Sequence, residues 1–142
     1  MLRTVAVIGF VIALAVGCGE GNVFELEEGD CFNQEESDEV SDVDIVSCDD
    51  PHEYEVYAVL SIAEPLGRPF PGSTRVGDVG FQLCLDRFEE FVARPYPESL
   101  LDISILAPTR ESWEDLDDRE VVCSLFDLEN FFMEGSMQGS GR

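Results

Sequence analysis

The sequence predicts an α+β domain, in which a small antiparallel or mixed sheet of about four strands has one main helix packed across it and is stapled by two disulfides. Three observations support this prediction. Short segments alternate between apolar and polar residues, as strands do, and one longer segment repeats its apolar residues every three or four positions, as an amphipathic helix does. Four cysteines lie within the same region. In chain order, the predicted elements are two strands, the helix and two further strands.

Strands are predicted in four segments. Residues 43–48 (VDIVSC) follow residues 33–44, an acidic stretch that we expect to be an exposed loop, and residues 53–62 (EYEVYAVLSI) form the clearest strand. The apolar residues of this strand fall on two faces, Tyr54, Val56, Ala58 and Leu60 on one, Tyr57 and Val59 on the other. Because both faces are apolar, we expect it at the centre of the sheet. The last two strands are residues 100–108 (LLDISILAP) and 121–128 (VVCSLFDL).

The helix is predicted from about residue 75 to residue 93. It follows a loop with three prolines and two glycines, residues 63–75, and the prolines of residues 93–99 (ARPYPES) end it. Its buried face consists of residues at helical spacing: Val76, Val79, Gly80, Leu83, Cys84, Phe88 and Phe91. Cys84 on that face can pin the helix to the sheet. After the next strand, residues 109–120 are predicted to be a polar excursion that contains the single tryptophan.

The first residues are predicted to be a lipoprotein signal peptide rather than part of the domain. An apolar run of twelve residues, residues 5–16, is long enough for a signal core but shorter than the roughly 20 apolar residues of a membrane span. The small residues before Cys18 resemble the lipobox of bacterial lipoproteins, although Ala15 stands where leucine is usual. We therefore predict a signal peptide at residues 1–17, lipidation of Cys18 and a short flexible spacer within residues 18–28. The anchor would hold the chain on the extracytoplasmic face of the plasma membrane. An ordinary secretory signal and a short uncleaved anchor are the alternatives.

The mature chain is strongly acidic. From Cys18 onward, seven arginines, no lysine and 31 acidic residues give a formal charge of −24. Nucleic acid and anionic lipid headgroups are poor partners for such a surface, whereas basic protein surfaces and divalent cations suit it. The same charge destabilises the compact state through self-repulsion, so another interaction must offset it.

Four cysteines remain once Cys18 is assigned to the lipid: Cys31, Cys48, Cys84 and Cys123. An even number in an exported chain of this size predicts two disulfides. Three pairings are open from the sequence, and we favour Cys31–Cys48 with Cys84–Cys123, because each crosslink closes one supersecondary unit. By the loop-entropy argument, these crosslinks stabilise the domain by about 3 and about 4 kcal/mol. That is a large fraction of the net stability of a domain, so the crosslinks can act as a counterweight to the charge.

The only histidine, His52, lies in the stretch CDDPH at residues 48–52, and any zinc site would have to form around it. Cys48 cannot ligate a metal while it is part of a disulfide, because the thiolate is the ligand, and the chain has no second histidine or CxxC pair. Glu55 follows three positions later, on the opposite face if the strand is regular. We therefore favour a structural turn, in which Pro51 fixes the backbone and the two aspartates bond backbone amides.

No catalytic residue, metal or cofactor is predicted. The sequence contains neither a nucleophile elbow nor a phosphate-binding loop, and 31 acidic residues make any pair of carboxylates uninformative. Two alternatives stay open: a metal-dependent envelope hydrolase that uses His52 with carboxylates, and an acidic module that binds calcium weakly. The calcium ligands would be Asp115, Asp117, Asp118 and Glu120. Arg119 lies among these acidic residues, which argues against calcium binding. An Arg119 paired with an acid beside Trp113 is better explained as a structural brace.

Several short motifs follow one another in a fixed order. They are GDCF (29–32), VSCDDPHEYEVYAV (46–59), FPG (70–72), Cys84, a run with Pro108, Trp113, Asp118, Arg119 and Cys123, and GSMQGSG near the C-terminus. This set resembles the septum formation-related domain of actinobacterial envelope proteins, over roughly residues 29–140. One departure is Asp117, where the family commonly has glycine. The resemblance implies structural roles for seven motif residues: Asp30, Pro51, His52, Glu55, Trp113, Asp118 and Arg119.

The resemblance implies a small secreted or membrane-anchored module, over residues 29–134, and the glycine and serine content predicts a flexible tail over residues 135–142. Together with the signal at Cys18, it predicts a non-enzymatic, lipid-anchored domain that binds a protein or wall partner of the cell envelope or division septum. The expected partners are the membrane, through the lipid, and an envelope or division protein, but not nucleic acid.

Overall fold

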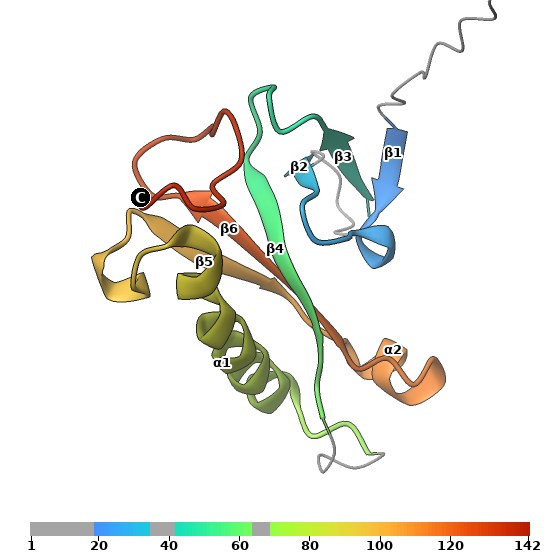
Figure 1. The fold of residues 1–142 in the computed structure, drawn as a ribbon. Coiled ribbons are helices and arrows are strands. Elements are labelled where there is room, and N and C mark those ends of the chain that lie inside the picture. The colour runs from blue at the N-terminus through green and yellow to red at the C-terminus, as the bar shows by residue number, and fades with distance from the viewer. Residues whose placement is uncertain (1–18, 35–41, 64–68) are drawn as a thin grey trace, which may run out of the picture.

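The computed structural model describes residues 19–34, 42–63 and 69–142, with side chains from residue 23 onward (Figure 1). The predicted signal peptide and Cys18 lie outside these residues, as does most of the predicted acidic loop. Within the described ranges, no helix is both long enough and apolar enough to cross a membrane.

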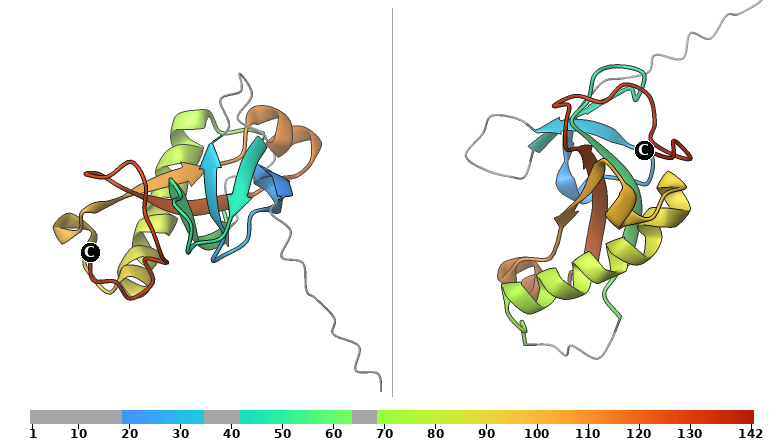
Figure 2. Two further views of the ribbon diagram at one scale, coloured as in Figure 1. Left: turned by 90° about the horizontal axis from the view of Figure 1, so that it is seen from above. Right: turned by 90° about the vertical axis from the view of Figure 1, so that its left-hand side faces the viewer.

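The strands of the described residues join one antiparallel sheet of six, in the order β1-β3-β2-β4-β6-β5. Their bounds are β1 Gly19–Asn22, β2 Cys31–Gln34, β3 Asp42–Val46, β4 Tyr54–Ser61, β5 Leu101–Leu106 and β6 Glu120–Asp127. The long helix α1 (Ser73–Val92) lies across one face of the sheet, against β4, β5 and β6 (Figure 1, Figure 2). The predicted α+β class with one main helix is confirmed, although the sheet is larger than predicted. Short 3₁₀ turns at Val23–Glu25 and Tyr96–Glu98 complete the described elements.

Strands β1 and β2 were not predicted, because their sequences are too short and too polar to show the alternation of a strand. The sequence of β1, GEGN, has no apolar side chain, and that of β2, CFNQ, has only two apolar residues before two polar ones. Strand β2 nevertheless pairs with both β3 and β4, and β1 pairs with β3 at the edge of the sheet. Residues 19–22 are therefore part of the sheet rather than of the flexible spacer predicted after Cys18.

Strand β4 lies between β2 and β6, which confirms its predicted place inside the sheet. Its alternation is broken by a β-bulge between Val56 and Ala58. Tyr57 and Ala58 both belong to the core on the helix side, while Val56 belongs to the cluster on the opposite face. The predicted assignment of Tyr57 and Ala58 to opposite faces is therefore wrong, because a bulge adds one residue and shifts the two-residue period.

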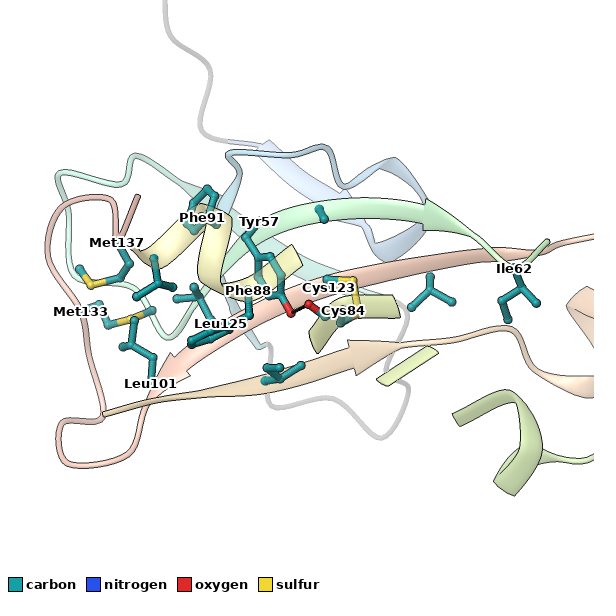
Figure 3. Packing of buried hydrophobic residues seen from close by; sticks show 14 of the residues in the cluster. Tyr57, Ile62, Cys84, Phe88, Phe91, Leu101, Cys123, Leu125, Met133 and Met137 are labelled. Atoms are coloured by element: carbon teal, nitrogen blue, oxygen red, sulfur yellow. Dashed lines mark hydrogen bonds between the residues drawn. A yellow bond between two sulfur atoms is a disulfide. The ribbon is translucent and has the colours of Figure 1, made fainter. Parts of the chain in front are cut away.

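The main core fills the space between α1 and the sheet (Figure 3). Tyr57 packs edge-on against Phe88, with ring centroids 6.0 Å apart, and its hydroxyl donates to the Cys84 carbonyl oxygen at 2.9 Å. Burial raises the pKa of the Tyr57 hydroxyl well above its ordinary value, so the hydroxyl remains a donor. A smaller cluster covers the other face of the sheet and consists of Leu26, Phe32, Val43, Val56 and Val122.

The two disulfides pair as favoured from the sequence. Cys84–Cys123 joins the middle of α1 to β6 inside the main core (Figure 3). Cys31–Cys48 joins the first residue of β2 to the turn after β3. The Cys84–Cys123 crosslink therefore holds the helix on the sheet, and Cys31–Cys48 holds the paired strands β2 and β3 together.

A second helix, α2 (Arg110–Asp115), lies where the sequence predicts only a polar excursion. Thr109 caps it through a reciprocal pair of hydrogen bonds. The Thr109 hydroxyl accepts from the Ser112 backbone N–H at 3.1 Å, and the Ser112 hydroxyl accepts from the Thr109 backbone N–H at 3.0 Å. A capping box usually has glutamate or glutamine at the position of Ser112, so the sequence gives only a weak signal for the start of this helix. The helix buries Trp113 in the main core.

The turn after α2 is braced by a stacked arginine. The Arg119 guanidinium lies 3.7 Å from the centre of the Trp113 ring, and it also pairs with Asp117 at 3.1 Å. Asp117 has a φ of 54°, a left-handed conformation that glycine adopts freely and aspartate tolerates. This explains how aspartate can take the place of the glycine that the resemblance leads one to expect here. The Asp118 carboxylate accepts from the Glu120 backbone N–H at 2.9 Å, so both aspartates serve the turn.

The packing of α1 against β6 at Gly80 gives a prediction. A Cβ atom at Gly80 would lie 3.3 Å from a methyl carbon of Val121. We predict that Gly80→Leu lowers the free energy of unfolding by about 1–3 kcal/mol, because it overpacks the contact between helix and sheet. Urea denaturation measures this change. Gly77→Leu is the matched control, since a Cβ there meets nothing within 4 Å, and an equal loss in both variants would contradict the prediction.

Candidate functional site

Four residues form a polar centre where β4 begins: the buried Cys31, His52 and Glu55 and the half-buried Cys48. Cys31 opens β2, Cys48 follows β3, and Glu55 is the second residue of β4. His52 lies just before β4 and forms a bridge with Met133, through backbone hydrogen bonds of 3.0 and 2.8 Å. The polar centre is therefore built from three neighbouring strands and a segment near the C-terminus.

His52 is fully buried, and one of its ring nitrogens has no partner. Its Nδ1 atom lies 2.8 Å from the carbonyl oxygen of Asp50, which places the proton on Nδ1 as the donor. Nε2 then carries a lone pair, and no group among the described residues hydrogen-bonds to it. Because buried polar atoms rarely lack a partner, this nitrogen distinguishes His52 from an ordinary turn residue.

Glu55 is only 1% exposed, and donors from the C-terminal segment satisfy its carboxylate. One oxygen accepts from the Ser136 hydroxyl, and the other accepts from the Met137 backbone N–H at 2.6 Å. Both donors lie more than 80 positions later in the sequence. Glu55 thus ties the C-terminal segment to a central strand of the sheet.

The structure brings His52 and Glu55 together, contrary to the prediction of opposite faces. Ligand atoms of Cys31, His52 and Glu55 all lie within 4.8 Å of one another. The chain bends at Glu53 and the strand begins only at Tyr54, so the alternation of a regular strand does not connect the two residues. The prediction was wrong because it extended the strand through this bend. Within the described ranges, no other set of three such side chains gathers closely enough to hold a metal ion.

The C-terminal segment packs against the domain, so the prediction of a flexible tail is wrong. Met133 and Met137 are buried in the main core (Figure 3). Gly139 and Gly141 donate their backbone N–H groups, at 2.7 and 2.8 Å, to carbonyl oxygens in the last turn of α1. A helix cannot satisfy these carbonyls itself. Both glycines have positive φ, so the glycines that suggest looseness in the sequence are needed for these turns.

Asp127 fixes the start of the same region. Its buried carboxylate accepts from the backbone N–H groups of Glu129 at 2.8 Å and Asn130 at 2.9 Å, and from the Arg142 guanidinium at 2.5 Å. Burial raises the pKa of the Asp127 carboxyl, but the hydrogen bonds from Glu129 and Asn130 and the charge of Arg142 outweigh it. The pKa therefore lies below its ordinary value of 3.8.

An apolar surface lies beside this region. Its four side chains are exposed by 44, 60, 75 and 51%, and they are Leu100, Leu128, Phe131 and Phe132. The Leu128 backbone N–H donates to the Leu100 carbonyl oxygen at 3.0 Å, and the two phenylalanine rings have centroids 4.9 Å apart. This surface was not predicted from the sequence. The adjacent phenylalanines in a polar stretch were the available signal, because neighbouring residues rarely both point into a core.

A small cavity of about 120 Å³ opens next to the apolar surface. Its lining combines aromatic and acidic side chains with one amide: Gln34, Glu53, Tyr54, Phe126, Asp127 and Phe131. Aromatic faces beside carboxylates attract cationic side chains, through cation–π and charge interactions.

Two further motif residues shape turns around the polar centre. The carboxylate of Asp30 accepts from the Glu27 backbone N–H at 2.8 Å, and its carbonyl accepts from the Val56 N–H at 2.8 Å. Pro51 separates Asp50 from His52, the two residues that the Nδ1 hydrogen bond joins.

Weak calcium binding by the acidic residues 115–120 stays a prediction.

The polar centre, both disulfides and the braced turn after α2 fall within one match to a known family. The family whose sequence model matches the chain is described as Septum formation, and the match covers residues 28–138. The chain belongs to this family. No curated protein and no solved structure matches it. The match confirms the resemblance carried by the sequence motifs and indicates a module related to cell division or the envelope.

The charge on Asp127 gives a prediction for this septum formation domain. Asp127→Asn should lower the free energy of unfolding near neutral pH by about 1–3 kcal/mol, because charge-assisted hydrogen bonds are lost. The folded-state pKa of Asp127 is depressed, so its contribution is complete above the unfolded-state pKa and disappears as the pH falls through the folded-state pKa.

Urea unfolding at several pH values between about 7 and 2 measures this dependence. The difference in stability between wild type and Asp127→Asn should shrink toward the acid end. Asp49→Asn, at an exposed carboxylate, is the control and should change little at any pH. A difference for Asp127→Asn that stays constant with pH would contradict the prediction.

Proposed function

We propose that this septum formation domain is a non-enzymatic module that binds a basic protein partner of the cell envelope, held at the outer face of the plasma membrane by a lipid on Cys18. The observation that carries the proposal is the apolar surface, formed by Leu100, Leu128, Phe131 and Phe132. Large apolar side chains that are exposed near one another mark interaction sites, and the two phenylalanine rings lie 4.9 Å apart between centroids. Aromatic residues are also enriched in protein interfaces.

The apolar surface is held in position from both ends. At one end, the Asp127 carboxylate binds the backbone that follows it, and at the other end Met133 is buried and bridges His52. The residues between them, 128–132, therefore form a short arch with fixed ends. A loop that is already ordered loses little conformational entropy on binding, which favours affinity.

The charge of the chain determines the kind of partner. Its net charge is −23 over the whole sequence, and Glu129 and Glu134 flank the phenylalanines. A second copy of the chain would carry the same charge and be repelled. A protein surface with apolar side chains ringed by lysine or arginine would gain apolar burial together with complementary charge. The cavity beside Phe131, with Glu53 on its wall, suits one of those cationic side chains.

The burial of the polar centre supports binding rather than catalysis. His52 is 0% exposed and Glu55 is 1% exposed, so a substrate in solution cannot contact either group in this state. His52 is also the only histidine in the chain, so any catalytic histidine would have to be this one. The geometry therefore offers nothing in favour of the envelope hydrolase.

The envelope location rests on the sequence and on the family. The lipobox-like stretch before Cys18 predicts the anchor, and the family match associates the chain with septum formation. An anchored domain would meet partners that share its membrane face, where a modest affinity suffices because the effective concentration is high.

Replacing the exposed aromatics tests the docking surface. We predict that a fluorescent fusion of the wild type concentrates at division sites and that the double variant Phe131→Ser, Phe132→Ser spreads evenly along the membrane. A photo-crosslinking residue at position 131 should capture a basic protein, with a yield that falls as salt screens the contact. Capture of wall polymer instead would contradict a protein partner.

Leu116→Ser is the matched control, because Leu116 is 72% exposed but lies at the C-terminal end of α2, outside the apolar surface. This variant should keep the wild-type distribution and give no crosslink when the probe is placed at position 116. If the phenylalanine variant kept the wild-type localisation, the apolar surface would not be the docking site. An even distribution of the wild type would remove the septal role.

The anchor has its own test. Cys18→Ala should release the protein from the membrane fraction into the medium, because the acyl chains that hold it have no attachment site. Fractionation followed by immunoblotting measures the release, and intact mass detects the lipid on the wild type. Ala15→Leu, which restores the usual lipobox residue, is the control and should remain in the membrane fraction. Retention of Cys18→Ala would refute the lipid anchor.

A further inference from the structure

The unused nitrogen of His52 has the setting of a metal ligand. Its Nε2 atom is buried without a partner among the described residues, and its Nδ1 donates to the Asp50 carbonyl oxygen at 2.8 Å. Histidines that bind metals characteristically donate their second ring nitrogen to a backbone carbonyl or a carboxylate, which fixes the tautomer and the ring. His52 therefore has a fixed ring orientation and a free lone pair on a buried nitrogen.

Two neighbours of His52 are also residue types that bind metals. Ligand atoms of Cys31, His52 and Glu55 lie within 4.8 Å of one another, and the sulfur of Cys48 is bonded to that of Cys31. Atoms bound to one tetrahedral zinc ion at about 2.0–2.3 Å lie about 3–4 Å apart, so the present spacing is close to that of a site. The disulfide is what blocks binding, because a cysteine ligates zinc only as a thiolate, and two ligands without the cysteines are too few for a site.

We propose that reduction of the Cys31–Cys48 disulfide converts the polar centre into a zinc site with Cys31, Cys48, His52 and Glu55 as ligands. Two thiolates, one imidazole and one carboxylate give the four ligands that close a tetrahedral structural site. Backbone and hydroxyl donors from the C-terminal segment already orient the Glu55 carboxylate. This inference does not rest on the docking surface proposed above.

The reductant in this step is a dithiol, of the kind carried by thioredoxin-like oxidoreductases. One of its thiolates attacks the sulfur of Cys48, which is partly exposed, and the S–S bond breaks with its electron pair passing to Cys31. The second thiolate of the reductant attacks the mixed disulfide and releases Cys48, leaving the reductant oxidised. Two electrons reach the cysteine pair, and Zn²⁺ takes the two thiolates in place of two protons.

The second disulfide supplies an internal comparison. Cys84–Cys123 lies among the apolar side chains of the main core, away from the single group of potential metal ligands found in the described residues. Reduction exposes two thiols at each place, but only the polar centre adds a histidine and a carboxylate. Zinc binding at the polar centre should therefore depend on His52 and Glu55, and not merely on the presence of thiols.

The test measures binding of Zn²⁺ itself by the full mature chain. The protein is reduced with a phosphine, which does not bind as a thiol would, and is dialysed with Zn²⁺ and then against metal-free buffer. Native mass spectrometry and competition with a chromogenic chelator give the stoichiometry and the affinity. We expect one zinc ion per reduced chain and none per oxidised chain. A reduced chain that retains no zinc would overturn the proposal.

Two matched variants assign the ligands. His52→Asn has an amide that can still donate to the Asp50 carbonyl oxygen but has no lone pair at the Nε2 position, and it should weaken zinc binding at least about tenfold. Glu55→Gln keeps an acceptor for the C-terminal segment and should weaken binding similarly. The double variant Cys31→Ser, Cys48→Ser retains the other cysteine pair and should bind no zinc. Equal affinity in the wild type and His52→Asn would overturn the site.

Because reduction also removes crosslinks that stabilise the domain, folding is measured alongside binding. Zn²⁺ should raise the Tm of the reduced wild type, or restore its circular dichroism where reduction unfolds it, and should do neither for His52→Asn. Cobalt(II) in place of zinc should show thiolate charge-transfer bands and the d–d absorption of tetrahedral coordination. Zinc uptake without any gain in folding, or an octahedral cobalt spectrum, would contradict a formed site.

Discussion

The buried carboxylate of Glu55 is the contact on which the arrangement of the C-terminal region depends. It stands on an inner strand of the sheet and binds the Ser136 hydroxyl and the Met137 amide. With that segment in place, Met133 and Met137 cover the core, and two glycine amides satisfy carbonyl oxygens at the end of α1. A buried carboxylate without donors would be strongly destabilising, so the strand and the segment require each other.

The same segment explains how so acidic a chain remains compact. Only two acidic side chains of the described residues are buried, Glu55 and Asp127, and both receive their donors from residues that follow β6. The other acids of these residues stay in contact with water, where their repulsion is screened. The two disulfides add a contribution that charge does not weaken, because they act chiefly by restricting the unfolded chain.

The sequence predicted α1, β3, β4, β5 and β6, whose residues repeat with the period of a helix or a strand, and it favoured the cysteine pairing that the structure has. It did not predict β1 and β2, which are too short and too polar to show the alternation of a strand. It also did not predict α2, because the capping box of this helix has Ser112 where glutamate or glutamine is usual. His52 could be singled out as the only histidine. Its contact with Glu55 could not, because a bend at Glu53 and donors more than 80 positions away create it.

One stretch of chain connects the polar centre with the apolar surface. It leaves β6 at Asp127, carries the exposed phenylalanines, bridges His52 through Met133 and ends on Glu55 through Ser136. In the oxidised state, both oxygens of the Glu55 carboxylate serve this stretch. A zinc ion at the polar centre would bind a further lone pair of this carboxylate, because each carboxylate oxygen can accept a hydrogen bond and ligate a metal. The donors of Ser136 and Met137 would then fix a zinc ligand, and the arch that presents the phenylalanines and the cysteine pair would be linked through the single carboxylate of Glu55.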